Sequence, residues 1–277
     1  MSIPFVKMHA FGNDFVVMRG KTAPHFDAAF IRRISNRCTG IGFDQLLWLE
    51  PPHSEANDVF YRIFNADGGE VEQCGNGARC IARLLAGDES DHQRTYLMEY
   101  GHGVVKANIT ADDLVSVGMG IPAIEPAALP FVTTQAAPPY RAQAAGQNVE
   151  FSVVSMGNPH AVLLVDDVDS ANVATLGPAL ERHECFPNRA NIGFMQILSN
   201  SHIKLRVFER GVGETQACGT GACAAAAAGQ LAGLLGKKVT VSLPGGDVQV
   251  HWNGPGSEVY LTGEAVTVFE GQLSDNF

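Results

Sequence analysis

Two cysteines, each at the start of a glycine-rich turn, are the residues whose type and setting best suit chemistry. Residues 74–78 read Cys-Gly-Asn-Gly-Ala, and residues 218–222 read Cys-Gly-Thr-Gly-Ala. An apolar stretch follows each turn, which predicts a helix that begins beside the cysteine. Uncovered N–H groups and the positive end of the helix dipole stabilise anions there. A thiol so placed can have its pKa lowered from about 8.5 towards about 3.5–7.5, and the same N–H groups can bind a carboxylate.

The two turns belong to a longer internal repeat. When the chain is shifted by 144 positions, Phe64 aligns with Phe208, and the match around both turns needs no gap. Further upstream the Gly-Asn pair that ends at Asn13 resembles the pair that ends at Asn158, with a small shift. A period this long that occurs twice indicates paired domains, because the repeats of a solenoid have about 20–50 residues.

Two facing cysteines suit the inversion of a carbon centre. If the duplicated units face each other, one thiolate removes a proton from one face of a carbon and one thiol returns a proton to the other. Two converging helix starts would stabilise the negative charge that develops on an α-carboxylate. The arrangement predicts racemisation or epimerisation without a cofactor. The alternative for each cysteine alone is a small buried side chain, and the repetition of the pair in one context favours the chemical interpretation.

Polar turns near the proposed cleft offer groups for a polar substrate. The guanidinium of Arg210 suits a second carboxylate because its fork binds two oxygens, and Glu209 suits an ammonium group. Together they indicate a substrate that is an amino acid at both ends. His160 can either tune the pKa of a cysteine or cap its turn. The polar residues of these turns are Asn13, Gln45, Asn65, Asn158, Asn191, Glu209 and Arg210.

Alternating apolar residues and isolated helical stretches predict an α+β fold class. Each cysteine turn follows a predicted strand, over residues 58–64 and 203–208. Both cysteine-led helices are apolar nearly all round, which favours enclosure by a sheet. We therefore expect two pseudo-symmetric domains, each an antiparallel sheet or half-barrel wrapped around a central helix, with the active site in the cleft between them. The crossing is expected near residues 118–122, and the strand at 265–269 lies beyond the repeat and must pair elsewhere.

Composition and charge exclude several classes of partner. The 277 residues carry a formal net charge of -10, which argues against nucleic acid or an anionic membrane because both need clustered Lys and Arg. The longest run of low polarity, residues 221–236, is shorter than the roughly 20 residues of a membrane-spanning helix.

The first residues show no secretory signal, so a cytoplasmic location is expected. The six cysteines are then expected to be thiols, and their spacing does not favour zinc.

Several segments together resemble the diaminopimelate epimerase family. They occur in one order along nearly the whole chain, at residues 9–15, 42–45, 64–68, 73–79, 156–160, 189–194, 209–211 and 218–221. The resemblance implies a cofactor-independent epimerase that converts LL- to meso-diaminopimelate for lysine and peptidoglycan synthesis. It also implies a bacterial cytoplasmic enzyme that is a homodimer, and a C-terminal strand returning to the first domain. The implied domains are residues 1–118 plus 264–277, and residues 119–263.

The same resemblance assigns roles to individual residues. By the family pattern Cys74 and Cys218 are the two acid/base residues, and His160 and Glu209 are similar to residues thought to adjust them. The residues implied to hold substrate are Asn13, Gln45, Asn65, Asn158, Asn191, Glu209 and Arg210, with Gly75, Asn76, Gly219 and Thr220 presenting N–H groups to the α-carboxylate.

Two other interpretations stay open at this stage. A related cysteine-pair racemase that acts on proline would share the chemistry but would not need Glu209 and Arg210 for a distal amino-acid end. A thiol redox or zinc protein predicts bound zinc or a functional disulfide between Cys74 and Cys218, whereas that bond would inactivate the epimerase.

Overall fold

The chain forms two compact units, Met1–Gly118 with Thr262–Phe277, and Met119–Leu261. The structure is a computed structural model that describes residues 3–22, 26–71, 74–87 and 94–274. Residue 73, which opens one of the segments that carry the family resemblance, lies outside the described residues. The sequence-based division placed the same first boundary after residue 118 and the return to the first unit at residue 264.

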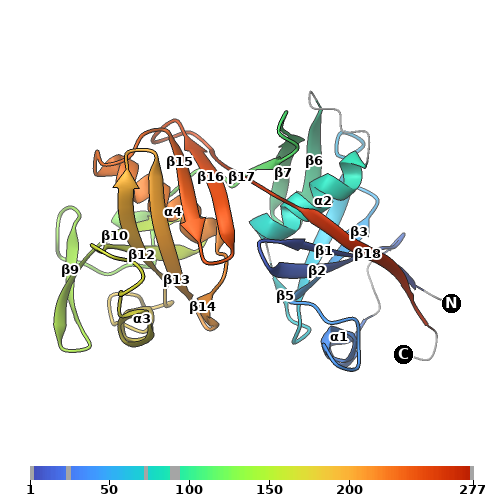
Figure 1. Cartoon of the computed structure of the whole chain (residues 1–277), viewed down its shortest axis with the longest axis horizontal. Helices are drawn as coiled ribbons and strands as arrows, with labels where there is room; N and C mark the ends of the chain where they lie inside the picture. The colour runs from blue at the N-terminus through green and yellow to red at the C-terminus, as the bar shows by residue number, and fades with distance from the viewer. Residues whose placement is uncertain (1–2, 23–25, 72–73, 88–93, 275–277) are drawn as a thin grey trace. The chain divides into compact units, whose positions relative to one another are not determined.

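The first unit is a mixed sheet with two helices. Its strands are β1 (Ile3–Ala10), β2 (Asn13–Arg19), β3 (Gln45–Glu50), β4 (Val59–Asn65), β5 (Glu70–Val71), β6 (Thr95–Tyr100), β7 (Gly103–Ile109), β8 (Val115–Gly118) and β18 (Val266–Leu273), and its helices are α1 (Ala28–Ser35) and α2 (Gly75–Ala86). The sheet order is β18-β1-β2-β3-β4-β6-β7-β8. Figure 1 shows β18 lying along β1, so the C-terminal strand pairs within the first unit.

The second unit repeats this plan. Its strands are β9 (Tyr140–Ala144), β10 (Gln147–Ser155), β11 (Pro159–Leu164), β12 (Asn191–Ser199), β13 (His202–Glu209), β14 (Gly213–Thr215), β15 (Lys238–Leu243) and β16 (Gly246–Trp252), and its helices are η1 (Pro126–Ala128), α3 (Val173–Glu181) and α4 (Gly219–Leu231). The strand β17 (Val259–Gly263) begins in this unit and runs past its last residue, Leu261. The order β9-β10-β11-β12-β13-β15-β16 reproduces the sequence of antiparallel and parallel pairings of the first unit.

The α+β class expected from the sequence is confirmed, but the sheets are not purely antiparallel. In the first unit β2 pairs with β3, and β4 with β6, in parallel. In the second unit β11 pairs with β12, and β13 with β15, in parallel. A parallel pair needs a long crossover connection. In the described part of the chain an α-helix lies between the two strands of each of these pairs: α1, α2, α3 and α4 in turn.

The helices α2 and α4 pack on their own sheets. In α4 the residues from Gly221 to Gly229 are buried, and most are alanines whose small side chains let strands approach closely. In α2 burial covers the first two turns, from Gly75 to Ala82, and the last turn is half-buried. Within the described residues, no helix has the length and apolar character needed to cross a membrane.

Candidate active site

Each candidate cysteine is the residue from which its helix begins. Cys74 is the N-cap of α2 and Cys218 is the N-cap of α4, both with extended backbone. Among the described residues neither side chain makes a capping hydrogen bond. The first helical bonds run to the carbonyl groups of the two cysteines from Ala78 N–H and Ala222 N–H, both at 2.9 Å. The N–H groups of the first turn, which include those of Gly75 and Gly219, therefore have no partner within the helix.

A side chain larger than hydrogen would fit tightly at the glycine in the first turn of each helix. A Cβ at Gly77 would be 3.0 Å from Leu47 Cδ2. A Cβ at Gly221 would be 3.0 Å from Val207 Cγ2 and 3.1 Å from Cys218 Sγ. The glycines that recur in the two turns thus allow the helix start to pack against a strand.

Asn13 connects Cys74 to the neighbouring polar residues of the first unit. Its Oδ1 lies 3.9 Å from Cys74 Sγ and accepts a hydrogen bond from Asn76 Nδ2 at 3.2 Å. Its Nδ2 donates to Asp44 Oδ2 at 3.0 Å. The tight turn between β1 and β2 that presents Asn13 has positive φ at Phe11 and Gly12.

Gln45 and Asn65 form a cross-strand pair beside this group. They lie opposite each other on β3 and β4, and Gln45 Nε2 donates to Asn65 Oδ1 at 2.9 Å. Among the described residues, the buried Oε1 of Gln45 has no hydrogen-bond partner. It is an acceptor suited to an N–H or ammonium donor of a ligand.

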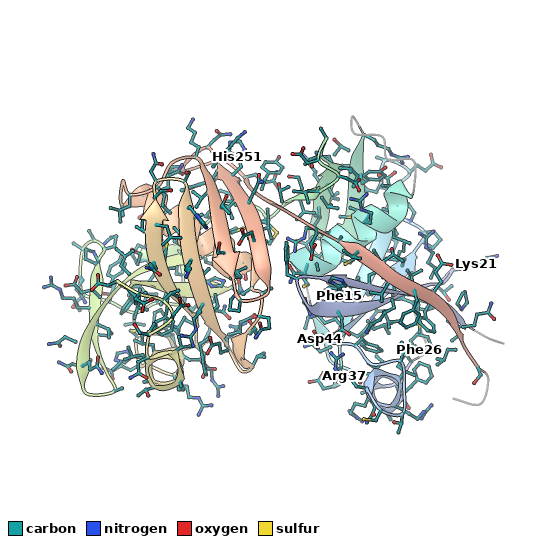
Figure 2. All side chains as sticks on the ribbon, in the orientation of Figure 1. Phe15, Lys21, Phe26, Arg37, Asp44 and His251 are labelled. Atoms are coloured by element: carbon teal, nitrogen blue, oxygen red, sulfur yellow. The ribbon has the colours of Figure 1, made fainter. Side chains whose placement is uncertain are left out.

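Asp44, which accepts a hydrogen bond from Asn13, belongs to a cluster of charged residues that the sequence did not single out. Arg37, in the loop after α1, donates to Asp14 at 2.7 and 3.0 Å and to Asp44 Oδ1 at 2.8 Å (Figure 2). Lys7 also pairs with Asp14. Burial alone would raise the pKa of Asp14, but the hydrogen bonds from Arg37 and Lys7 outweigh it and hold the value at about 2. The Arg37 side chain stays 59% exposed while it makes these ion pairs.

The second unit surrounds Cys218 with a different set of groups. Cys218 is only 4% exposed, and its Sγ lies 3.7 Å from Thr220 Oγ1. Asn158 Nδ2 donates to the same Oγ1 at 3.3 Å. His160 Nε2 contacts Asn158 Oδ1 at 3.1 Å. His160 therefore reaches Cys218 only through Asn158 and Thr220.

Burial is the main influence on the pKa values of the groups around Cys218, which we call the second half-site. It raises the pKa of the Cys218 thiol well above its ordinary value, and the nearby Glu209 carboxylate adds to the effect. The Gly221 N–H lowers the pKa of Cys218, as a helix start should, but the two opposing effects are larger. The sequence-based expectation of a lowered pKa is therefore wrong for Cys218. Burial likewise raises the pKa of Glu209, and burial followed by the charge of Arg210 lowers the pKa of His160 to about 3.

Asn191 and Glu181 fix the turn that carries Arg210. The buried Asn191 donates through Nδ2 to Pro159 O at 3.1 Å and accepts from Arg210 N–H at 3.0 Å. Glu181, which the sequence did not single out, is also buried and accepts from Gly211 N–H at 2.8 Å. The guanidinium of Arg210 is exposed and makes a single hydrogen bond of 3.2 Å, to Asn188 O, among the described residues.

The described part of the chain contains no cluster of three or more His, Cys, Asp or Glu residues that could hold a metal ion.

The site residues named above fall into two groups. One surrounds Cys74 in the first unit, and the other surrounds Cys218 in the second. Each combines a helix-start thiol, an asparagine and a polar side chain from the first helical turn.

Comparison with known proteins gives a family and a fold. The family model described as diaminopimelate epimerase matches residues 5–124 and 152–268. The fold is shared with a hydroxyproline epimerase from Agrobacterium vitis, with bound trans-4-hydroxy-L-proline, at 16% identity and TM-score 0.70, over 98% of this chain and 92% of that chain. It is also shared with a Bacillus anthracis phenazine biosynthesis protein of the PhzF family, at 17% identity and TM-score 0.71, over 99% of both chains. A methylitaconate-delta-isomerase aligns at 15% identity and TM-score 0.68, over 99% of this chain and 95% of that one.

Proposed function

The chain belongs to the diaminopimelate epimerase family, and from this premise we propose that it interconverts LL- and meso-2,6-diaminopimelate with two cysteines and no cofactor. The family match places the protein among the isomerases. The specific substrate is our inference. The observation that carries the two-cysteine mechanism is the matched pair of helix-start cysteines in the two halves of a duplicated fold, with Asn13 beside Cys74 and with Asn158 bonded to Thr220 beside Cys218.

The proposed reaction moves one proton off and one proton onto the same carbon. A thiolate takes the α-proton, and the electron pair left behind spreads into the α-carboxylate. The opposite thiol then gives its proton to the other face of the carbon, so charge and atoms balance without an oxidant. Helix-start N–H groups of the two turns stabilise the carboxylate as its negative charge grows in the transition state.

In this scheme Cys218 is the acid when Cys74 is the base. The raised pKa of Cys218 supports that assignment because its sulfur holds a proton at neutral pH. In the reverse direction Cys218 must lose the proton, and protonation of Glu209 would help because it removes the nearby negative charge. The raised pKa of Glu209 makes that protonation less costly.

The remaining polar residues are proposed to bind substrate. Gln45 Oε1 supplies a buried acceptor in the first unit, and the exposed guanidinium of Arg210 has donors available for the distal carboxylate. We place Asn13, Asn65, Asn158 and Asn191 in the same role, with Asn76 and Thr220 contributing from the first helical turns. By the same family argument we propose a homodimer in a bacterial cytoplasm.

A second candidate function is the inversion of proline or hydroxyproline. It is favoured by the shared fold with the hydroxyproline epimerase that binds trans-4-hydroxy-L-proline. Such a substrate has no distal amino-acid end, so it leaves Arg210 without a role. The two candidates therefore differ in what happens when Arg210 is changed.

The test compares three substrates with wild type and Arg210→Met. Reduced protein is incubated with LL-diaminopimelate, L-proline or trans-4-hydroxy-L-proline, and the isomers are separated by chiral chromatography. We expect turnover of diaminopimelate alone, and a fall in kcat/KM of about 10- to 150-fold in Arg210→Met, the value of a charged hydrogen bond. Arg141→Met, which removes an exposed arginine paired with Glu150, is the control and retains activity. Turnover of proline without turnover of diaminopimelate would overturn the proposal.

A further inference from the structure

The turn asparagines of the two halves hold their side-chain amides in opposite orientations. Asn13 and Asn158 occupy similar places in the repeat, and each is hydrogen bonded to the third residue of its cysteine turn. In the first unit Asn13 accepts through Oδ1 from Asn76. In the second unit Asn158 donates through Nδ2 to Thr220. The direction of the equivalent hydrogen bond is therefore reversed.

In the first unit the orientation is set from both ends of a hydrogen-bond chain. At one end the fully buried Arg79, which can only donate, bonds to Asn76 Oδ1 at 2.8 Å. Asn76 must then present Nδ2 to Asn13 Oδ1, at 3.2 Å. At the other end the Asp44 carboxylate, which accepts, receives Asn13 Nδ2 at 3.0 Å. Both ends demand the same orientation of Asn13.

Asp44 is itself held as an acceptor. Arg37 donates to its Oδ1 at 2.8 Å, and the Asp14 N–H donates to its Oδ2 at 3.2 Å. Arg37 is tied in turn to Asp14, which also pairs with Lys7. Both oxygens of the Asp44 carboxylate can only accept hydrogen bonds, so either one presents an acceptor to Asn13 while the other stays paired with Arg37.

The second unit has a donor where the first has Asp44. His160 is fully buried with its pKa lowered to about 3, so the ring is neutral. Its Nε2 lies 3.1 Å from Asn158 Oδ1, and the Nε2–H tautomer donates there. Asn158 consequently turns its Nδ2 to Thr220. An acidic partner in one half and an imidazole in the other thus account for the reversal.

We propose that Asp44 and Arg79 are positioning residues that hold the Asn13 amide with its oxygen, and not its nitrogen, towards Cys74 Sγ. The proposal rests on the acid/base role of Cys74 in the proposed function. An amide oxygen 3.9 Å from the sulfur accepts an S–H and repels a thiolate. We call this fixed orientation of the Asn13 amide, held by Asp44 and Arg79, the lock. It favours the protonated form of Cys74 in the protein without ligand, and a substrate that bonds to Asn13 Oδ1 would remove that preference.

The test must leave unchanged the other ionisable residues that affect the pKa of Cys74. They are Tyr61 on β4 and Cys80 on α2, which interact electrostatically with Cys74, and the charged cluster of Lys7, Asp14 and Arg37 behind Asn13. None of these is altered in the variants below. The readout is thiol reactivity and not turnover, so failure of this proposal and failure of the proposed substrate give different results.

The experiment measures the rate at which iodoacetamide alkylates Cys74 between pH 5 and pH 10. Trypsin cleaves after Arg79 and separates Cys74 from Cys80, so mass spectrometry follows the Cys74 peptide alone. In Asp44→Asn the new amide can donate to Asn13, so only the Arg79–Asn76 end still favours the original orientation, and Asn13 turns its Nδ2 towards the sulfur in part of the population. We expect the midpoint of the pH profile to fall and the rate at pH 7 to rise about threefold to tenfold, as one hydrogen bond would cause.

A double-mutant comparison separates this effect from the loss of the Asp44 charge. Removing a negative charge also favours a thiolate, but that effect does not need Asn13. In an Asn13→Ala background Asp44→Asn should change the rate much less than in the wild type. An equal change in both backgrounds, or no change in Asp44→Asn, would refute the lock. Glu70→Gln, which neutralises an acid paired with Arg62 in the same unit, is the matched control. If Asp44→Asn does not fold, Asp44→Ser removes the carboxylate with a smaller side chain.

Discussion

His160 is a buried titratable side chain whose neutrality the second half-site requires. Its Nε2–H holds Asn158, and Asn158 in turn holds the Thr220 hydroxyl beside Cys218. The folded state resists protonation of His160 because burial removes water from the ring and Arg210 repels the added charge. The protein therefore couples the geometry around Cys218 to acid stability.

His160 is expected to make the protein less stable in mild acid. Its pKa falls from 6.5 to about 3 on folding, so below pH 6.5 the unfolded chain binds the proton and the folded chain does not. Stability is complete above pH 6.5 and decreases as pH falls towards 3. Between pH 7.5 and pH 5 the free energy of unfolding should drop by about 2 kcal/mol from this group.

The measurement is urea unfolding at the two pH values for wild type and His160→Gln. Glutamine can donate to Asn158 but does not titrate, so the variant should lose about 2 kcal/mol less than wild type on acidification. His251→Gln, a change of the same type on β16, should keep the wild-type difference. An equal loss in wild type and His160→Gln would show that His160 does not cause the acid sensitivity.

Residue roles were predictable from the sequence where they depend on local patterns. The helix-start positions of Cys74 and Cys218 follow from the turns themselves. The contacts of Asp44 and Glu181 with Asn13 and Gly211 do not, because each joins positions about 30 residues apart. The direction of the pKa shift of Cys218 was mispredicted because it depends on burial and on a neighbouring carboxylate.

At the scale of elements, the first turn of each cysteine-led helix packs tightly against neighbouring side chains at its second glycine. The two turns differ in what a methyl group would contact. At Gly221 it would be 3.0 Å from Val207 Cγ2 and 3.1 Å from Cys218 Sγ, whereas at Gly77 the nearest atoms belong to Leu47 and Phe15. The glycine in α4 therefore sets the position of the thiol itself, and the glycine in α2 sets the packing of the helix on its sheet.

Gly221→Ala is expected to reduce turnover more than Gly77→Ala. The methyl group in α4 would press on both Val207 Cγ2 and Cys218 Sγ, and we expect a shift of the proposed catalytic sulfur by a few tenths of an ångström to lower kcat by about tenfold. In Gly77→Ala the overpacking against Leu47 should cost stability of about 1 kcal/mol with a smaller change in kcat. Steady-state kinetics and thermal unfolding of both variants test this. A larger loss of kcat in Gly77→Ala would contradict the assignment.

The elements themselves were largely predictable, and their pairing was not. Apolar periodicity indicated α2, α4 and the strands β4 and β13, because those segments are long and strongly patterned. The short strands β5 and β14 lie in segments that read as turns. Parallel pairing such as that of β2 with β3 depends on the helix that crosses between them, and local alternation carries no information about it.

At the scale of the whole molecule, one fold unit occurs twice with the same order of strand pairings, and each copy places a cysteine at the start of its enclosed helix. The repeat in the sequence predicted this duplication directly. The copies have diverged around the sulfurs. Cys74 is half-buried and contacts Asn13, whereas Cys218 is buried beside Glu209. Such divergence fits two thiols with unequal roles at rest.

The central claim, that both cysteines act on one substrate carbon, is tested most directly by proton NMR of LL-diaminopimelate in heavy water. Reduced, metal-stripped wild type is compared with Cys74→Ala, Cys218→Ala and the exposed-site control Cys38→Ala. We predict that wild type and Cys38→Ala introduce deuterium at the α-carbon as the meso isomer forms, and that neither of the other variants completes the inversion. Inversion by Cys74→Ala or Cys218→Ala, or no exchange by reduced wild type, would contradict the account.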